Sequence, residues 1–285
     1  MGTTRTLGDW LLSVEPDGGL TPSQQRVADV IMTHQQLASY SEIAEIADRA
    51  LVNASTVVRF AKTLGFTGWP DLRRELRGRY LASLSTEETL REHGDVARSV
   101  VHGAITRDID NLRTALDSID PAESDAVVRT LAGADRILTV GFGSFSSPAM
   151  TLAHLGTIIG YPISYEGRGG TNLAAALTTL GVGDVLVAFT AWRPVRDVLL
   201  AVTAARASGC TIVALTDLRS GRLAALADHV LVIPCEGVSY FQSVTAATAV
   251  VSGLLAGMEA AHPERSRTSL RRTQELWQQL GTFAG

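Results

Sequence analysis

Residues 53–66 read NASTVVRFAKTLGF, a stretch that begins with a helix-capping asparagine and ends at a glycine stop. At about 100° per residue, one arc of this helix collects its apolar side chains: Val57, Val58, Phe60, Ala61 and Leu64. The remaining arc carries hydroxyls and cations but no acid: Ser55, Thr56, Arg59, Lys62 and Thr63. A solvated surface helix usually mixes acids with bases, whereas a DNA-reading helix excludes carboxylates, which would meet phosphates and base-edge acceptors. The stretch therefore favours a recognition helix, with a plain amphipathic surface helix as the alternative.

The segments around this helix have the lengths of a helix-turn-helix motif. TPSQQRVADVIMTH (21–34) and SEIAEIADRA (41–50) each place apolar side chains on one helical face. Ser41 is predicted to cap the second of these helices and Asn53 the third, which leaves a corner of only three residues, 51–53. Downstream, the charges of residues 59–79 sum to about +4, a local basic patch in a chain whose net charge is -4.

From residue 134 onward, apolar β runs alternate with helical patterns. The runs are RILTVG (136–141), YPISYE (161–166), DVLVAFT (184–190), TIVALTD (211–217) and HVLVIPC (229–235). Nearly continuous apolar runs indicate strands buried on both faces, which requires a parallel sheet with helices on both sides. The fold class is therefore α/β: an all-α helix-turn-helix domain followed by a three-layer α/β/α domain with a five-stranded parallel sheet.

These patterns divide the chain into three parts. Residues 1–80 are predicted to form the helix-turn-helix domain, and residues 81–120, which are charged and low in glycine, a helical connector. Residues 121–285 are predicted to form the α/β domain, whose ligand crevice would lie at the carboxyl ends of the strands.

Composition argues against several other classes of protein. The two cysteines, Cys210 and Cys235, form no metal-spaced cluster, so they indicate reduced core thiols in a cytoplasmic protein. The six histidines show no zinc-binding spacing, and no metal or other cofactor is predicted. No apolar run reaches the roughly 18 residues of a membrane span, so no membrane partner is expected.

The string TPSQQRVADVIM…SEIAEIA…STVVRFAKTLGFTGWPDLRRELR resembles the N-terminal domain of RpiR-type bacterial transcriptional regulators. Those regulators pair a helix-turn-helix with a C-terminal SIS (sugar isomerase) domain, so the resemblance implies this layout over about residues 20–260. In that family the corner usually reads AGVS, whereas here Leu51 occupies the glycine position. Since glycine tolerates positive φ, Leu51 predicts a corner that is either strained or changed in geometry.

The resemblance also implies a phosphosugar site in loops after the first, third and fourth strands. The candidate effector-binding residues in these loops are Gly141, Gly143, Ser144, Ser146, Thr190, Trp192, Arg193, Arg196, Thr216 and Ser220. Phe145 occupies the position where the family commonly has a phosphate-contacting serine. In TAWRPVRD (190–197) the family's hydroxyls are mostly replaced, but two arginines stand at a predicted helix N-terminus, where they can hold a phosphate or a carboxylate. Trp192 either stacks on a ligand ring or serves as a packing residue.

These features predict a DNA-binding transcriptional regulator that senses a small carbohydrate-derived anion, either a sugar phosphate or a sugar acid. Its partners would be double-stranded DNA and further copies of itself, as a homodimer or homotetramer, with Arg73, Arg74 and Arg77 holding the DNA backbone. Enzyme activity is not expected, because Glu166, Asp197, Asp217 and Glu236 form no acid–base string with a histidine. A sugar-phosphate isomerase with an accessory helical domain and a ligand-free dimerisation scaffold are the alternatives.

Overall fold

The computed structural model describes residues 7–16, 18–92 and 100–283. The chain divides into two compact units, Met1–Gly94 and Asp95–Gly285, and each is described here by itself. The division falls inside the predicted connector, of which residues 93–99 lie outside the described residues. The role of residues 81–120 as a connector stays a prediction.

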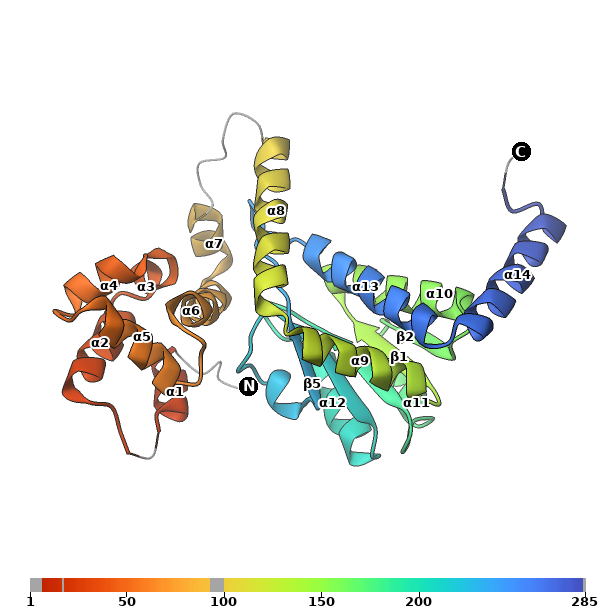
Figure 1. The fold of residues 1–285 in the computed structure, drawn as a ribbon, viewed down its shortest axis with the longest axis horizontal. Helices are drawn as coiled ribbons and strands as arrows, with labels where there is room; N and C mark the ends of the chain where they lie inside the picture. Colours follow the sequence, from red (N-terminus) through yellow and green to blue (C-terminus); the bar gives the residue numbers. More distant parts are fainter. Residues whose placement is uncertain (1–6, 17, 93–99, 284–285) are drawn as a thin grey trace. The chain divides into compact units, whose positions relative to one another are not determined.

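The described part of the first unit is entirely helical (Figure 1). Its helices are α1 (Leu7–Val14), α2 (Pro22–Thr33), α3 (Gln35–Tyr40), α4 (Ile43–Arg49), α5 (Ala54–Thr63), α6 (Trp69–Ser83) and α7 (Thr86–Glu92). One apolar core joins them, and its largest fully buried side chains include Phe60, Trp69, Leu72 and Leu76. Helix α5 thus packs into this core through most of the apolar arc predicted for it, while Val58 of that arc is half-buried.

Capping residues explain where two of these helices begin. Thr21 and Gln24 form a capping box at the start of α2, and the Asn53 side chain caps α5 by accepting a hydrogen bond from the Thr56 N–H. The predicted Ser41 cap of α4 is wrong by one residue, because Glu42 holds the N-cap position without a side-chain cap bond. Ser41 instead ends α3 and donates its hydroxyl to Glu45 Oε2 at 2.7 Å.

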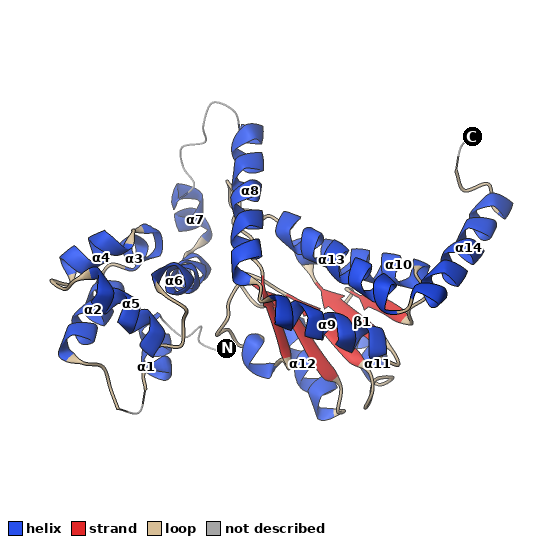
Figure 2. Cartoon of the chain, viewed as in Figure 1, coloured by secondary structure: helices blue, strands red, loops and turns tan. Residues whose placement is uncertain are grey.

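The second unit is a five-stranded parallel sheet with helices on both faces (Figure 2). The strands are β1 (Ile137–Gly141), β2 (Ile163–Glu166), β3 (Val185–Phe189), β4 (Thr211–Thr216) and β5 (His229–Val232), in the order β2-β1-β3-β4-β5. The helices are α8 (Val100–Ser118), α9 (Pro121–Gly133), α10 (Ser146–Ile158), α11 (Gly170–Leu177), α12 (Arg196–Ala207), α13 (Thr245–Ala261) and α14 (Pro263–Gln279), with short 3₁₀ turns at Gly143–Phe145 and Ala224–Leu226. The predicted fold class is confirmed.

Alternation along each strand builds two separate cores. Ile137 of β1 packs with α9, α10 and α13, whereas the next residue, Leu138, packs with α11 and α12 on the opposite face (Figure 1). Since side chains alternate along a strand, the continuous apolar runs are needed to fill both layers.

The strand order places the expected ligand crevice. In the sheet, β2 lies on one side of β1, and β3, β4 and β5 follow in order on the other side. The direction of chain progression across the sheet therefore reverses between β1 and β3. In open α/β sheets, ligands bind at such a switch point, beyond the carboxyl ends of the strands.

Among the described residues, no helix is long and apolar enough to cross a membrane. Those residues also contain no cluster of histidine, cysteine, aspartate or glutamate that fits a metal ion.

Candidate DNA-binding helix and effector edge

The first turn of α5 is organised around the Asn53 side chain. Its Oδ1 accepts hydrogen bonds from the Thr56 N–H at 3.1 Å, the Thr56 hydroxyl at 2.9 Å and the Ser55 hydroxyl at 2.7 Å. At the other end, Gly65 has φ 86°, and the Phe66 N–H bonds to the Ala61 carbonyl at 3.0 Å. Both ends of α5 are therefore stabilised by local hydrogen bonds, from residues that the sequence predicts as helix start and stop.

The polar face of α5 differs from the predicted one at a single residue. Ser55, Arg59, Lys62 and Thr63 are exposed as predicted, but Thr56 is only 6% exposed. Its hydroxyl turns inward to Asn53 and accepts a hydrogen bond from Arg59 Nη2 at 3.0 Å. Thr56 therefore orients Arg59 and does not itself form part of the exposed face.

The corner before α5 is strained. Leu51 has φ 52°, in the left-handed region where glycine is favoured, and its side chain is 82% exposed. The Leu51 N–H bonds to the Asp48 carbonyl at 3.2 Å and the Val52 N–H to the Ala47 carbonyl at 2.9 Å. Of the two outcomes open from the sequence, the corner keeps its turn and accepts the strain.

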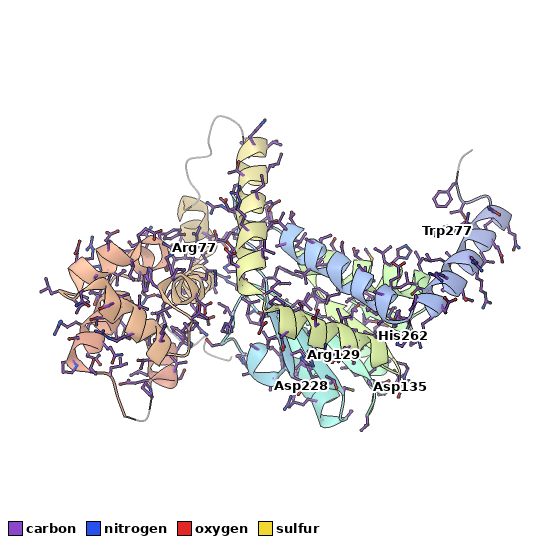
Figure 3. The ribbon with its side chains drawn as sticks, viewed as in Figure 1. Arg77, Arg129, Asp135, Asp228, His262 and Trp277 are labelled. Carbon is purple, nitrogen blue, oxygen red and sulfur yellow. The ribbon has the colours of Figure 1, made fainter. Side chains whose placement is uncertain are left out.

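The three downstream arginines expected at the DNA backbone all have contacts within their own unit. Arg73 pairs with Glu42 at 2.6 Å and Arg74 with Asp71 at 3.1 Å. The Arg77 guanidinium, on α6 (Figure 3), lies 4.3 Å from the centre of the Tyr40 ring. All three are half-buried, and their proposed role at phosphates stays a prediction.

Sequence reasoning missed a polar hollow of about 480 Å³ beside the corner, and with it Arg26. The hollow is lined by Ser23, Arg26, Ala47, Asp48, Leu51, Val52, Asn53 and Thr56. Arg26 Nε donates to the Ala50 carbonyl at 3.1 Å, so this cation sits beside the N-terminus of α5. An arginine inside a helical pattern gives no sign in the sequence that it caps the end of another helix.

At the other site, the strand register brings the three candidate loops to one edge of the sheet. Gly141 of β1 pairs with Phe189 of β3, which pairs in turn with Leu215 of β4. The loops after these strands therefore leave the sheet side by side. Gly141 itself lies so close to the Phe145 carbonyl that a Cβ there would come within 2.5 Å of its oxygen.

The expected hydroxyls at this edge are unequally accessible. Ser144 and Ser220 are exposed, whereas Thr190 and Thr216 are 4% and 5% exposed. Ser146 is half-buried and donates its hydroxyl to the Gly143 carbonyl at 2.7 Å. Phe145 packs into the core.

The third-strand loop replaces phosphate-binding hydroxyls with an aromatic and two cations. Arg193 and Arg196 are exposed, and Arg196 is the first residue of α12, whose N-cap residue, Val195, makes no side-chain cap bond. Trp192 has φ 62°, donates its N–H to Asp217 Oδ2 at 2.9 Å and carries the Arg193 guanidinium 4.9 Å from its ring centre. Its ring also meets Tyr240 edge-on at 5.3 Å.

The four acids near these loops all have structural contacts. Glu166 pairs with Arg168 at 2.8 Å, and the hydrogen bond from the Arg168 side chain holds the pKa of this buried carboxyl below its usual value. Asp197 packs against Gly169, Asp217 holds the Trp192 N–H, and Glu236 pairs with Arg107 at 3.2 Å. Both cysteines are buried, and burial raises the pKa of each thiol, as expected of core residues.

A helical unit with a helix-turn-helix corner, joined to a three-layer parallel α/β unit, is the layout of a class of two-domain transcriptional regulators. Comparison with known families agrees: residues 15–83 match the helix-turn-helix domain of the rpiR family, and residues 130–257 match the SIS domain.

Individual relatives point the same way. An uncharacterised HTH-type transcriptional regulator of Haemophilus influenzae is 27% identical over 218 residues, which cover 75% of each chain. The sugar isomerase domain of an RpiR transcription factor from Sphaerobacter thermophilus is 32% identical with a TM-score of 0.60, over 62% of this chain and 98% of that one. The NanR protein of Vibrio vulnificus, solved in complex with ManNAc-6P, has the same fold at 21% identity and a TM-score of 0.62, over 93% of this chain and 96% of its own.

The chain belongs to the RpiR family of helix-turn-helix transcriptional regulators with an SIS domain.

Proposed function

We propose that the exposed face of α5 reads an operator in the major groove of double-stranded DNA, in the cytoplasm. The observation that carries this proposal is the acid-free exposed set of Ser55, Arg59, Lys62 and Thr63 on a helix capped at both ends. Arg59 would reach a base edge or a phosphate, because Thr56 already orients its guanidinium. Arg26, Arg73, Arg74 and Arg77 would take positions along the backbone.

We propose that the second unit binds a small carbohydrate-derived anion at the carboxyl edge of its sheet. Two exposed arginines, Arg193 and Arg196, flank the N-terminus of α12, where backbone N–H groups and the helix dipole favour negative charge. The ManNAc-6P bound by the NanR protein makes sugar phosphates the first class to test. Sugar acids are the second class, because a guanidinium donates bidentate hydrogen bonds to a carboxylate as well as to a phosphate.

Sensing is favoured over catalysis because of how the four nearby acids are used. Glu166 and Glu236 pair with arginines and Asp217 accepts the Trp192 N–H, so these three are held by other groups and are not poised as general bases. We therefore propose that the chain is not an isomerase. A ligand-free scaffold remains the competing outcome, since Phe145 and Trp192 fill space with apolar surface.

Thermal unfolding of the full chain tests the effector proposal. Glucose 6-phosphate, N-acetylmannosamine 6-phosphate, gluconate and glucose are each added, to wild type and to an Arg193→Ala, Arg196→Ala variant. At 100 Kd a specific ligand stabilises by about 2.7 kcal/mol, which raises the Tm by several degrees. We expect an anionic member to stabilise only the wild type. Stabilisation by glucose alone contradicts the anionic assignment, and stabilisation by no compound favours the scaffold.

The DNA proposal is tested by selection from a random pool of duplexes with the full chain. We expect an enriched sequence that binds far more tightly than the unselected pool at physiological salt. Enrichment of no sequence would count against operator recognition.

We also propose that the chain forms homodimers or homotetramers. Support comes from α8, where Val101, Ile105, Ile109, Leu112 and Leu116 lie exposed along one helical face. Light scattering of Ile109→Asp should then show a smaller assembly than wild type. Val182→Asp, at a residue 85% exposed on another surface of the unit, should not.

A further inference from the structure

The segment between β5 and α13, residues 234–244, is here called the tether. One end of it is bonded to α8. Asn111 of α8 is only 3% exposed and donates its amide to the Glu236 carbonyl at 2.8 Å, while Arg107 pairs with the Glu236 carboxylate at 3.2 Å. Next to the tether, Thr245 donates its hydroxyl to Asp108 at 2.6 Å. Three polar side chains from little more than one turn of α8 thus hold this part of the chain.

The middle of the tether touches the proposed effector loop. Tyr240 meets the Trp192 ring edge-on, with ring centres 5.3 Å apart. It also meets the ring of the next residue, Phe241, edge-on at 5.5 Å. The tether is folded tightly between its two ends, because a Cβ on Gly237 would collide with the Phe241 carbonyl. A shift of Tyr240 is therefore passed along a compact segment to Glu236, without slack to absorb it.

Trp192 is suited to respond to a ligand because its conformation is held from outside. A non-glycine residue at φ 62° is strained and persists only where its surroundings hold it. Here those surroundings are the Asp217 carboxylate on its N–H, the Arg193 guanidinium over its ring and Tyr240. An anion bound to Arg193 would draw that guanidinium away from the Trp192 ring and alter one of the three.

The receiving helix has a place in the chain that matters for DNA binding. Helix α8 begins at Val100, the first described residue of the second unit after the segment that leads from the first. Asn111 must keep its bond to Glu236, since a buried amide without a hydrogen-bond partner is destabilising. If Glu236 is displaced, either α8 moves with it or the hydrogen bond between Asn111 and Glu236 breaks.

We propose that the tether couples the effector loop to α8, with Tyr240 as the positioning residue at the contact with Trp192 and Asn111 as the positioning residue at the contact with Glu236. The purpose of this coupling, regulation of DNA binding, rests on the proposed function. The coupling itself is a property of the second unit and can be measured without ligand or DNA.

Hydrogen exchange of the full chain, read on the backbone amides of α8, tests the coupling. Asn111→Ala breaks the near end and sets the scale of the response. Tyr240→Ala and Trp192→Ala break the contact between the tether and the effector loop. We expect all three to speed exchange in the middle of α8 by about tenfold or more, because its local opening becomes easier.

Two variants serve as matched controls. Tyr240→Phe keeps the ring that contacts Trp192, so α8 should exchange as in wild type. Leu200→Ala shortens an exposed side chain on α12, away from the tether, and should also leave α8 unchanged. Far-ultraviolet circular dichroism verifies that each variant is folded. If Trp192→Ala does not fold, the result for Tyr240→Ala alone decides whether the coupling exists.

The proposal is overturned if Tyr240→Ala speeds exchange only within residues 234–244 while α8 stays as in wild type. It is likewise overturned if Tyr240→Phe affects α8 as strongly as Tyr240→Ala. A response of α8 together with no stabilising sugar phosphate or sugar acid would keep the coupling and reject the effector. Stabilisation by such a compound together with an unresponsive α8 would do the reverse.

Discussion

The turn before the recognition helix and the loop of the effector edge contain the two non-glycine residues with positive φ among those described, Leu51 at 52° and Trp192 at 62°. They are held in different ways. Leu51 is 82% exposed, and backbone hydrogen bonds of the corner hold it. Trp192 is held by side chains: the Asp217 carboxylate, the Arg193 guanidinium and the Tyr240 ring.

This difference suggests what each strain does. A conformation held by helix backbone changes only if the helices come apart, so the Leu51 corner is a fixed support for α5. A conformation held by side chains that a ligand can contact can be released, so the Trp192 loop is a place where binding energy can act. The strained residue of the helix-turn-helix unit is thus held rigidly, whereas that of the SIS unit is held by contacts that can adjust.

The largest expected effect tests what the fixed corner supports. Arg59→Ala removes an exposed cation from the face of α5 and should weaken binding to the selected DNA by about 1–3 kcal/mol, roughly 5- to 150-fold. Stability should change little, because Arg59 is exposed. Fluorescence anisotropy of labelled duplex measures the loss. Arg129→Ala, the same charge change on α9 (Figure 3), is the control and should bind as wild type. Equal binding by both variants would remove α5 from the DNA interface.

The next effect tests the side chains that hold Trp192. Trp192→Gly relieves the positive φ but loses an aromatic contact worth about 0.5–1.5 kcal/mol, a cation–π contact of about 0.5–1 kcal/mol and some burial. We expect a net destabilisation of about 1–2 kcal/mol, measured by urea unfolding. A variant more stable than wild type would mean that these side chains hold nothing.

The same substitution at the corner should have the opposite sign and a smaller size. Leu51→Gly removes a left-handed strain of about 1–2 kcal/mol and loses almost no burial, while glycine costs about 0.4–1 kcal/mol through the unfolded chain. A net gain of about 0.5–1 kcal/mol is expected in the same unfolding experiment, with DNA affinity unchanged. Leu51→Ala keeps the strain and should show no gain. A destabilised Leu51→Gly chain would show that the exposed leucine makes a contact worth more than its strain.

The sequence predicted the parts of this comparison that depend on local chemistry. The Asn53 cap, the apolar arc of α5 and the five parallel strands follow from neighbouring residues and from alternation, and all are present. Because Leu51 stands where the family has a glycine, the sequence predicted either strain or a changed geometry at this corner, and strain is what the structure has. The contacts that join distant residues could not be predicted. Arg26 reaches Ala50 across 24 residues, and Tyr240 reaches Trp192 only because β3 and β5 belong to one sheet. Thr56 was misplaced because an ideal helical wheel does not contain the side chain of its own capping residue.

The smallest effect concerns Glu166, at the carboxyl end of β2 on the same adjustable edge. Its pKa is held below the usual value of about 4.5, chiefly by the hydrogen bond from Arg168. A lowered folded pKa means that this carboxylate stabilises the fold above the unfolded pKa and loses that contribution as the pH falls through the folded value. Between about pH 5 and pH 3 the Tm of wild type should therefore fall more steeply than that of Glu166→Gln. Glu264→Gln removes a carboxylate whose side chain is 82% exposed and should keep the wild-type slope. Parallel slopes for wild type and Glu166→Gln would show that the ion pair with Arg168 adds nothing to the stability of this edge.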